Sequence, residues 1–385
     1  MISRRALTLA VLAVVLGAIA WGFDVWLRPR AAAYSYLAAF GWVFSSVLGA
    51  LAMHAIARAV DARWFSALSA LNGALTSATV VLPLLFLPLA LLLPRLYPWA
   101  NARQVAEHPE LHRAELFGHA WFGAGWFFFR AAVYLASWLA LAELMRRAER
   151  DEARRVPSLW ARNKIAIGAL ALPLLGFGGS WAAFDWLMSA VPGCNMTSFG
   201  LYLLMGGFGA ALGLLGLVVR SAKQRLLVPP EIDHAHSLAL GRLQLSAVCL
   251  WAYIAVSQLI IVWIANEPRE AAFYLPRAEG AFCWIAGLLI FGHFIGPFLL
   301  LLSRSWKQNW RFVAGLGAWL VLMHAFDLYW LVVPSAARGA SVLDAGPFLL
   351  LGGVSVVVAH ARSQRITAIP LHDPNLARSL AYESP

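Results

Sequence analysis

The side chains of this chain that could do chemistry are ionisable residues inside apolar stretches. Asp185 lies in the run Leu175 to Gly207, which is otherwise mostly apolar. An ionised carboxylate near the centre of a bilayer costs about 2.5 to 3.5 kcal/mol on insertion scales, so such residues usually face the protein interior, have a partner and mark a pathway or site. Asp185 is therefore the first candidate functional residue.

Further polar residues stand in similar apolar runs. Arg130 lies in the run before that of Asp185 and at a similar expected depth, which predicts an ion pair between them. His324 and Asp327 are three residues apart and so share one helical face. A proton relay needs such groups within hydrogen-bond reach of one another, directly or through water. We therefore predict a proton pathway, and its residues are His54, Glu143, His293, His324, Asp327, Asp185, Arg130 and Tyr253.

Three other interpretations of these residues stay open at this stage. In the first, each is only a satisfied polar group of the core, and Arg130 and Asp185 form a structural ion pair that joins two helices. A desolvated carboxylate beside an arginine also suits a quinone hydroxyl, and the candidate quinone-binding residues are Asp185, Arg130 and Tyr202. A haem held by two histidines would need His293 and His324 at matched depth.

The three cysteines, Cys194, Cys249 and Cys283, form no CxxC, CxxCH or Cys/His cluster. The sequence therefore contains no recognisable iron–sulfur, zinc or c-type haem motif, and we predict no metal site in this chain.

The composition indicates which kind of structural element holds these residues in place. Apolar residues make up 61% of the 385 residues and charged residues only 13%, with 18 Trp and a mean hydropathy of +0.70. A run of about 20 apolar residues spans a bilayer as a helix, and the short alternating segments of a barrel are not seen. The sequence predicts an all-α integral membrane protein with ten transmembrane helices. The first ends near Leu27, and the others cover 34–57, 71–93, 121–145, 164–188, 196–219, 239–265, 279–302, 311–333 and 346–361.

The first apolar run begins with basic residues and contains Ala18-Ile19-Ala20, which resembles a signal-peptidase site. We expect a retained helix, because the run continues through Trp26 and is long enough to span. Asp24, near the end of that helix, is expected to be solvated.

The net charge of +11 is explained by topology. Lys and Arg fall in short connections rather than on one face or tail, so no nucleic-acid partner is predicted. The connections after odd-numbered helices hold eight basic residues, whereas the termini and the other connections hold twenty-one. Because basic residues favour the cytoplasmic side, both termini are expected in the cytoplasm.

We expect one transmembrane domain, residues 1–361, and an extended cytoplasmic tail, residues 362–385. The basic segment 146–164 is predicted to be a solvated loop. The outer connection, about 94–120, is predicted to carry a short interfacial helix.

Several motifs together resemble a known family. They are LYPWA at 96–100, FFFRAAVYLASW at 127–138, FDWLMS at 184–189, FGLY at 199–202, WAYIAVSQLIIVWIANEPRE at 251–270, HFIGPFLLLLSR at 293–304, DLYW at 327–330 and DPNLARSL at 373–380. The chain is similar to the NrfD and polysulfide reductase-like membrane subunits, and within them to the ActF subunits of alternative complex III, a bacterial quinol:cytochrome c oxidoreductase.

The resemblance implies two four-helix bundles, helices 2–5 and 6–9, flanked by helices 1 and 10, in a bacterial inner membrane. It implies an ActC-like sister subunit and iron–sulfur and multihaem cytochrome c partners that carry the haem c and clusters. Such a chain is not catalytic alone and acts as a scaffold, a proton-translocating half, or both.

A direct quinol-binding anchor, with a quinone such as menaquinone, and a secondary transporter are the alternatives. Against the anchor, residues 190–197 lack the acidic, His, Trp and Tyr groups that ActF-like sequences usually carry there.

Overall fold

The computed structural model describes residues 4–100, 123–154, 156, 158–191, 194, 196–266, 268–364 and 375–383. Within these ranges ten helical stretches are long and apolar enough to cross a membrane, so the predicted number of spans is confirmed and the chain is a multi-pass membrane protein. They are α1 (Arg4–Leu27), α2 (Pro29–Ala59), the stretch of η1 (Arg63–Phe65), α3 (Ser66–Thr76), η2 (Ser77–Val81) and α4 (Leu82–Leu91), α8 (Ala124–Ala153), α10 (Lys164–Trp186), α11 (Phe199–Gln224), α12 (His234–Ala265), the stretch of α14 (Gly280–Leu288), the π-helix η6 (Leu289–Ile295) and α15 (Gly296–Leu302), α17 (Trp310–Val332), and α18 (Ala345–Ser363).

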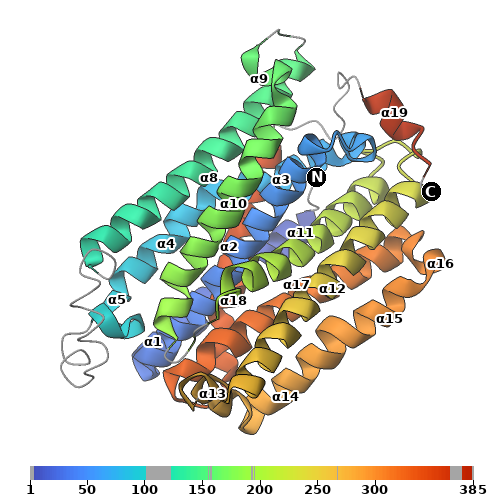
Figure 1. Cartoon of the computed structure of the whole chain (residues 1–385). Coiled ribbons are helices and arrows are strands. Elements are labelled where there is room, and N and C mark those ends of the chain that lie inside the picture. The colour runs from blue at the N-terminus through green and yellow to red at the C-terminus, as the bar shows by residue number, and fades with distance from the viewer. Residues whose placement is uncertain are drawn as a thin grey trace.

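Short helices connect or extend these spans. They are α5 (Leu93–Leu96), η3 (Pro98–Ala100), α9 (Leu159–Arg162), η4 (Met188–Ala190), α13 (Pro268–Tyr274), η5 (Leu275–Arg277), α16 (Arg304–Lys307), η7 (Val333–Ala336), η8 (Val342–Asp344) and α19 (Leu376–Leu380). Both termini lie at one end of the molecule, here called the terminal side, and α5 and α13 lie at the other, the opposite side (Figure 1).

Helices α2 and α11 form the centre of the molecule. Helix α2 packs against α10, α11, α17 and α18, and most of its residues are buried. Gly49 of α2 faces Gly207 of α11, where a Cβ would lie only 2.5 Å from the Gly207 carbonyl oxygen. Small residues allow such close helix contacts in membranes, where packing rather than the hydrophobic effect holds helices together.

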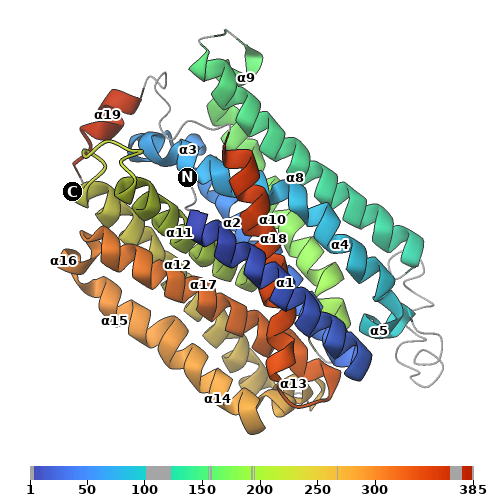
Figure 2. The ribbon, with the colours of Figure 1, turned by 180° about the vertical axis from the view of Figure 1, so that it is seen from behind.

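The first and last spans, α1 and α18, pack side by side against this centre, as Figure 2 shows. The expectation that Asp24 is solvated is wrong, because its side chain is fully buried at the end of α1. Arg28 donates from Nε to Asp24 Oδ1 at 2.7 Å and from Nη2 to Asp344 Oδ1 at 2.9 Å. This buried bridge fastens α1 to the start of α18.

A second buried arginine caps the C-terminal end of α17. Arg277 of η5 is 2% exposed, and it donates from Nε to Trp330 O at 3.2 Å and from Nη2 to Leu331 O at 2.6 Å. These carbonyls have no intrahelical donors at a helix C-terminus, so the guanidinium caps the helix. Burial lowers the pKa of Arg277 to about 10, which leaves the group protonated at neutral pH.

The basic segment 146–164 is not the loop that the sequence predicts. Helix α8 continues to Ala153, and α9 follows at Leu159–Arg162. Pairs between Glu143 and Arg146 at 2.9 Å and between Glu143 and Arg147 at 3.0 Å support this last part of α8.

The described part of the C-terminal tail is also not extended. Ser379 of α19 is buried, and its hydroxyl accepts from Ala67 N at 3.1 Å and donates to Trp64 O at 2.9 Å. Residues 375–383 therefore dock on η1 and α3. The interfacial helix expected in the connection 94–120 falls mostly in residues 101–122, which lie outside the described residues.

Candidate functional site

The ion pair predicted between Arg130 and Asp185 forms near the opposite side. Arg130 of α8 donates from Nε to Asp185 Oδ2 at 2.7 Å and from Nη2 to Oδ1 at 3.1 Å, and the Tyr134 hydroxyl donates to Oδ2 at 3.0 Å. Such a two-bonded arginine–carboxylate contact fixes both groups in direction as well as distance. Asp185 is 4% exposed, so this is a nearly buried ion pair.

Aromatic side chains pack around the residue that follows Asp185. Trp186 follows Asp185 in α10, and its ring lies 5.4 Å from that of Phe44 and 5.8 Å from that of Trp138. The Tyr97 hydroxyl donates to Trp186 O at 2.9 Å. These contacts hold the last turn of α10 next to the ion pair.

A second carboxylate, Asp327 of α17, is fully buried in the other half of the molecule. The Tyr202 hydroxyl of α11 donates to Oδ1, and Trp251 Nε1 of α12 donates to Oδ2 at 3.1 Å. In the part of the chain that the structure describes, no Arg or Lys contacts this carboxylate. Asp327 is thus held by neutral donors from two other helices.

Two histidines lie beside Asp327. His324 Nδ1 is 3.7 Å from Asp327 Oδ2 without a hydrogen bond, and its Nε2 is 2.8 Å from the Ser45 hydroxyl of α2. A Cβ on Gly206 of α11 would lie 2.5 Å from His324 Nδ1, so only glycine leaves room for this ring. Because Ser45 already occupies Nε2, His324 is not free to be a haem ligand through that nitrogen.

His293 reaches the same group from the π-helix η6. Its ring stacks on that of Trp251 with centroids 4.0 Å apart, and its Nδ1 is buried without a partner among the described residues. A π-helical turn inside an α-helix re-aims its side chains and frequently marks a functional site. Together, His293, His324, Asp327, Tyr202 and Trp251 form what we call the Asp327 group.

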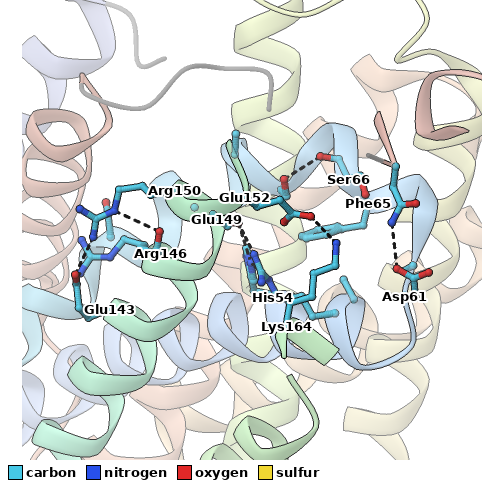
Figure 3. A pocket seen from close by; sticks show the side chains of 18 of the residues that line it. His54, Asp61, Phe65, Ser66, Glu143, Arg146, Glu149, Arg150, Glu152 and Lys164 are labelled. Carbon is cyan, nitrogen blue, oxygen red and sulfur yellow. Dashed lines mark hydrogen bonds and ion pairs between the residues drawn. The ribbon is translucent and has the colours of Figure 1, made fainter. Parts of the chain in front are cut away.

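A third group lies on the terminal side. His54 Nε2 of α2 is 3.0 Å from Glu149 Oε1 of α8, and Arg58 Nη2 is 3.3 Å from the same oxygen. Arg58 Nε donates to His54 Nε2 at 2.9 Å, and Asn72 Nδ2 lies 3.4 Å from His54 Nδ1. Figure 3 shows Glu149 and His54 facing each other.

The terminal-side group borders a cavity of about 640 Å³. It lies among the ends of α2, α3, α8, α10 and α18, and its charged lining residues are Arg58, Asp61, Glu143, Arg146, Glu149, Arg150, Glu152, Lys164 and Arg362. His54, which is 2% exposed, is one of its lining residues.

The structure does not bring every predicted pathway residue into these groups. Tyr253 is 69% exposed on the outside of α12. Glu143 pairs with arginines of its own helix at the cavity rim, and Glu149 takes the place by His54 that the sequence suggested for Glu143. In the described ranges, no hydrogen bond or ion pair joins the terminal-side group to the Asp327 group.

The candidate quinone residues do not assemble either. Tyr202 donates to Asp327 rather than to Asp185, and a quinol hydroxyl would have to displace Arg130 or Tyr134 to reach the Asp185 oxygens. These residues do not fit a quinone beside Asp185. Within the described residues, no group of three or more His, Cys, Asp or Glu side chains is placed to hold a metal ion.

Sequence reasoning missed Glu149 and Tyr134. Tyr134 is four residues after Arg130 and therefore on the same face of α8, a signal that was present in the sequence. Glu149 lies beyond the apolar run, where hydropathy gives no information on partners.

Comparison with known proteins adds no assignment: no family model and no curated protein matches the chain.

Proposed function

We propose that the chain is a proton-translocating membrane subunit of a quinol:electron-acceptor oxidoreductase that resembles alternative complex III. The observation that carries the proposal is Asp327, a fully buried carboxylate bound by Tyr202 and Trp251 and flanked by His324. Intramembrane carboxylates and histidines in such settings are typical of proton relays. We infer the type of complex from the family motifs, and the proton-translocating role from the Asp327 group.

The groups around Asp327 can remain bonded to it whether its carboxyl group is protonated or ionised. A tyrosine hydroxyl can donate to a carboxylate or accept from a carboxyl, so Tyr202 keeps a hydrogen bond with Asp327 in either state. His324 has one nitrogen toward Asp327 and the other on Ser45, which gives a proton two directions to leave. Proton transfer through these groups needs no metal in this chain.

The terminal-side cavity is the proposed entry for protons, with His54 and Glu149 at its inner end. Between these residues and Ser45, the relay requires water molecules or a change of conformation, since the described side chains leave a gap. In this proposal the terminal side is cytoplasmic, in a bacterial inner membrane. The two four-helix bundles, helices 2–5 and 6–9, would contain Asp185 and Asp327 respectively.

The proposed partners are an ActC-like sister subunit and iron–sulfur and multihaem cytochrome c subunits, which supply the redox groups. The test has two steps. The chain is purified in mild detergent and the co-purifying proteins are assayed for haem and iron. The complex is then reconstituted in liposomes, and quinol oxidation and membrane potential are measured for wild type and for Asp327→Asn.

The expected result is a complex that oxidises quinol but generates less than about a tenth of the wild-type potential per turnover, because general acid–base groups typically contribute about 10²-fold or more. Tyr253→Phe, an exposed position on α12, is the control and should behave as wild type. If Asp327→Asn kept quinol oxidation and membrane potential at wild-type levels, the proposal would be wrong.

A secondary transporter is the second candidate. It is favoured by the 3-10 stretch η2 in the third span and the π-helix η6 in the eighth, because transporters often interrupt helices at their substrate sites. This function predicts uptake of a solute by liposomes that contain the chain alone, whereas the subunit function predicts none.

A further inference from the structure

The charged cavity on the terminal side has a second property that proton entry does not use. Five cationic side chains line it, Arg58, Arg146, Arg150, Lys164 and Arg362, against four acidic ones, Asp61, Glu143, Glu149 and Glu152. Arg58 and Arg362 stand in the last turns of α2 and α18, where the apolar spans end. The lining is therefore at the depth of lipid head groups.

The acidic side chains of the lining are already bound to other groups. Lys164 Nζ is 2.7 Å from Glu152 Oε1, and Arg150 Nη2 is 2.8 Å from Glu143 Oε1. Figure 3 shows both contacts at the cavity. Asp61 accepts from the Asn375 side chain at 3.2 Å, and Glu149 Oε1 lies 3.0 Å from His54 Nε2 and 3.3 Å from Arg58 Nη2.

Two arginine nitrogens of the lining have no hydrogen-bond acceptor among the described residues. Arg58 Nη1 and Arg362 Nε are buried without a hydrogen-bond partner among the described residues. Arg362 also forms no ion pair within the described ranges, although its charge repels that of Arg146. An unpaired buried donor on a charged group costs free energy, so an acceptor that reaches these nitrogens is favoured.

We propose that this cavity binds a phosphate group through Arg58 and Arg362. Arginine matches phosphate in geometry, since its planar nitrogens donate two parallel bonds to two oxygens. The group can come from the head group of an anionic phospholipid of the adjoining leaflet or from free inorganic phosphate. Basic pockets between transmembrane helices are known to take such head groups. The site does not depend on the proposed redox complex.

The test compares two sources of phosphate with one variant. The purified full chain is placed in nanodiscs of phosphatidylcholine with a rising fraction of phosphatidylglycerol, and retained lipids are counted by native mass spectrometry. Inorganic phosphate is titrated separately in pure phosphatidylcholine nanodiscs. Arg362→Gln should weaken binding about tenfold, in line with the loss of one hydrogen bond to a charged group.

The control is Arg147→Gln, which removes the same charge from a side chain that is 58% exposed and is not a lining residue, although its partner Glu143 is. It should change binding less than about twofold, as expected for an exposed pair. Arg362→Lys provides a second variant if the glutamine variant does not fold, and it should bind more weakly than wild type because it cannot bond in parallel.

Retention of phosphatidylglycerol without phosphate binding would support the site and identify the lipid as its source, and the reverse would identify free phosphate. If wild type bound neither, or if Arg362→Gln and Arg147→Gln weakened binding equally, the proposal would be overturned.

Discussion

The ion pair between Arg130 and Asp185 allows a quantitative test of the structure. The perturbation is a set of three variants, Arg130→Met, Asp185→Leu and the two together. The side chains are 12% and 3% exposed, so each single variant removes one partner of a nearly buried pair. Breaking such a pair by removing one partner typically costs about 3–5 kcal/mol, whereas replacing both partners by apolar groups of similar volume is often near neutral.

The structure places this case at the lower end of that range. In Arg130→Met, the Asp185 carboxylate keeps the hydrogen bond from Tyr134, which leaves it partly satisfied. We therefore expect Arg130→Met to lower the free energy of unfolding by about 3 kcal/mol, and the double variant to lower it by less than about 1 kcal/mol. The two side chains are then coupled by at least about 2 kcal/mol.

The assay is chemical unfolding of the purified chain in detergent, followed by far-ultraviolet circular dichroism. Tyr134→Phe is a matched control that removes one hydrogen bond and leaves the ion pair, and it should cost about 1 kcal/mol. Equal costs for the single and double variants, or additive costs in the double variant, would refute the reasoning, because neither result is compatible with a desolvated pair.

Three further variants test other contacts. Gly206→Ala would place a methyl group 2.5 Å from His324 Nδ1; it should cost about 1–3 kcal/mol and reduce membrane potential per turnover in the reconstituted complex. Arg277→Met removes the cap on α17 and should speed amide hydrogen exchange at the end of that helix about tenfold or more. Ser379→Ala removes the two hydrogen bonds that the Ser379 hydroxyl forms with Ala67 and Trp64 and should expose the tail to proteolysis while the spans stay resistant.

Hydropathy was enough to find the spans but not their ends. Each of the ten apolar runs corresponds to one observed helical stretch, because a lipid-exposed backbone must pair its own polar groups and so forms a helix. Helix α8, however, continues from the end of its apolar run at residue 145 to Ala153. Hydropathy shows where contact with lipid ends, whereas a helix ends where its backbone hydrogen bonds end. Glu149 lies between the end of the apolar run and the end of α8.

Contacts were predictable where two residues shared a helix face or a depth in consecutive spans. Arg130 with Asp185 and His324 with Asp327 are of this kind. The contact between Arg28 and Asp344 was not predictable, because Asp344 lies near the other end of the sequence; it links Asp344 to Asp24, which Arg28 also binds.

The exposure of Tyr253 was not predictable for a different reason. Its helix α12 carries apolar residues on all faces, and so periodicity gives no sign of which face meets protein and which meets lipid. Only the packed structure shows that Tyr253 is exposed.

The two buried carboxylates differ in a way that assigns them different tasks. Arg130 binds both oxygens of Asp185, can only donate hydrogen bonds and keeps its positive charge beside them. Asp327 meets Tyr202, whose hydroxyl can reverse its direction, and no fixed cation in the described chain. In a proton-translocating chain, the change of charge then belongs to Asp327, and Asp185 holds α8 to α10. The paired replacement of Arg130 and Asp185 by apolar residues, which preserves the fold, must therefore also preserve translocation, and loss of translocation in that folded variant would return Asp185 to the pathway.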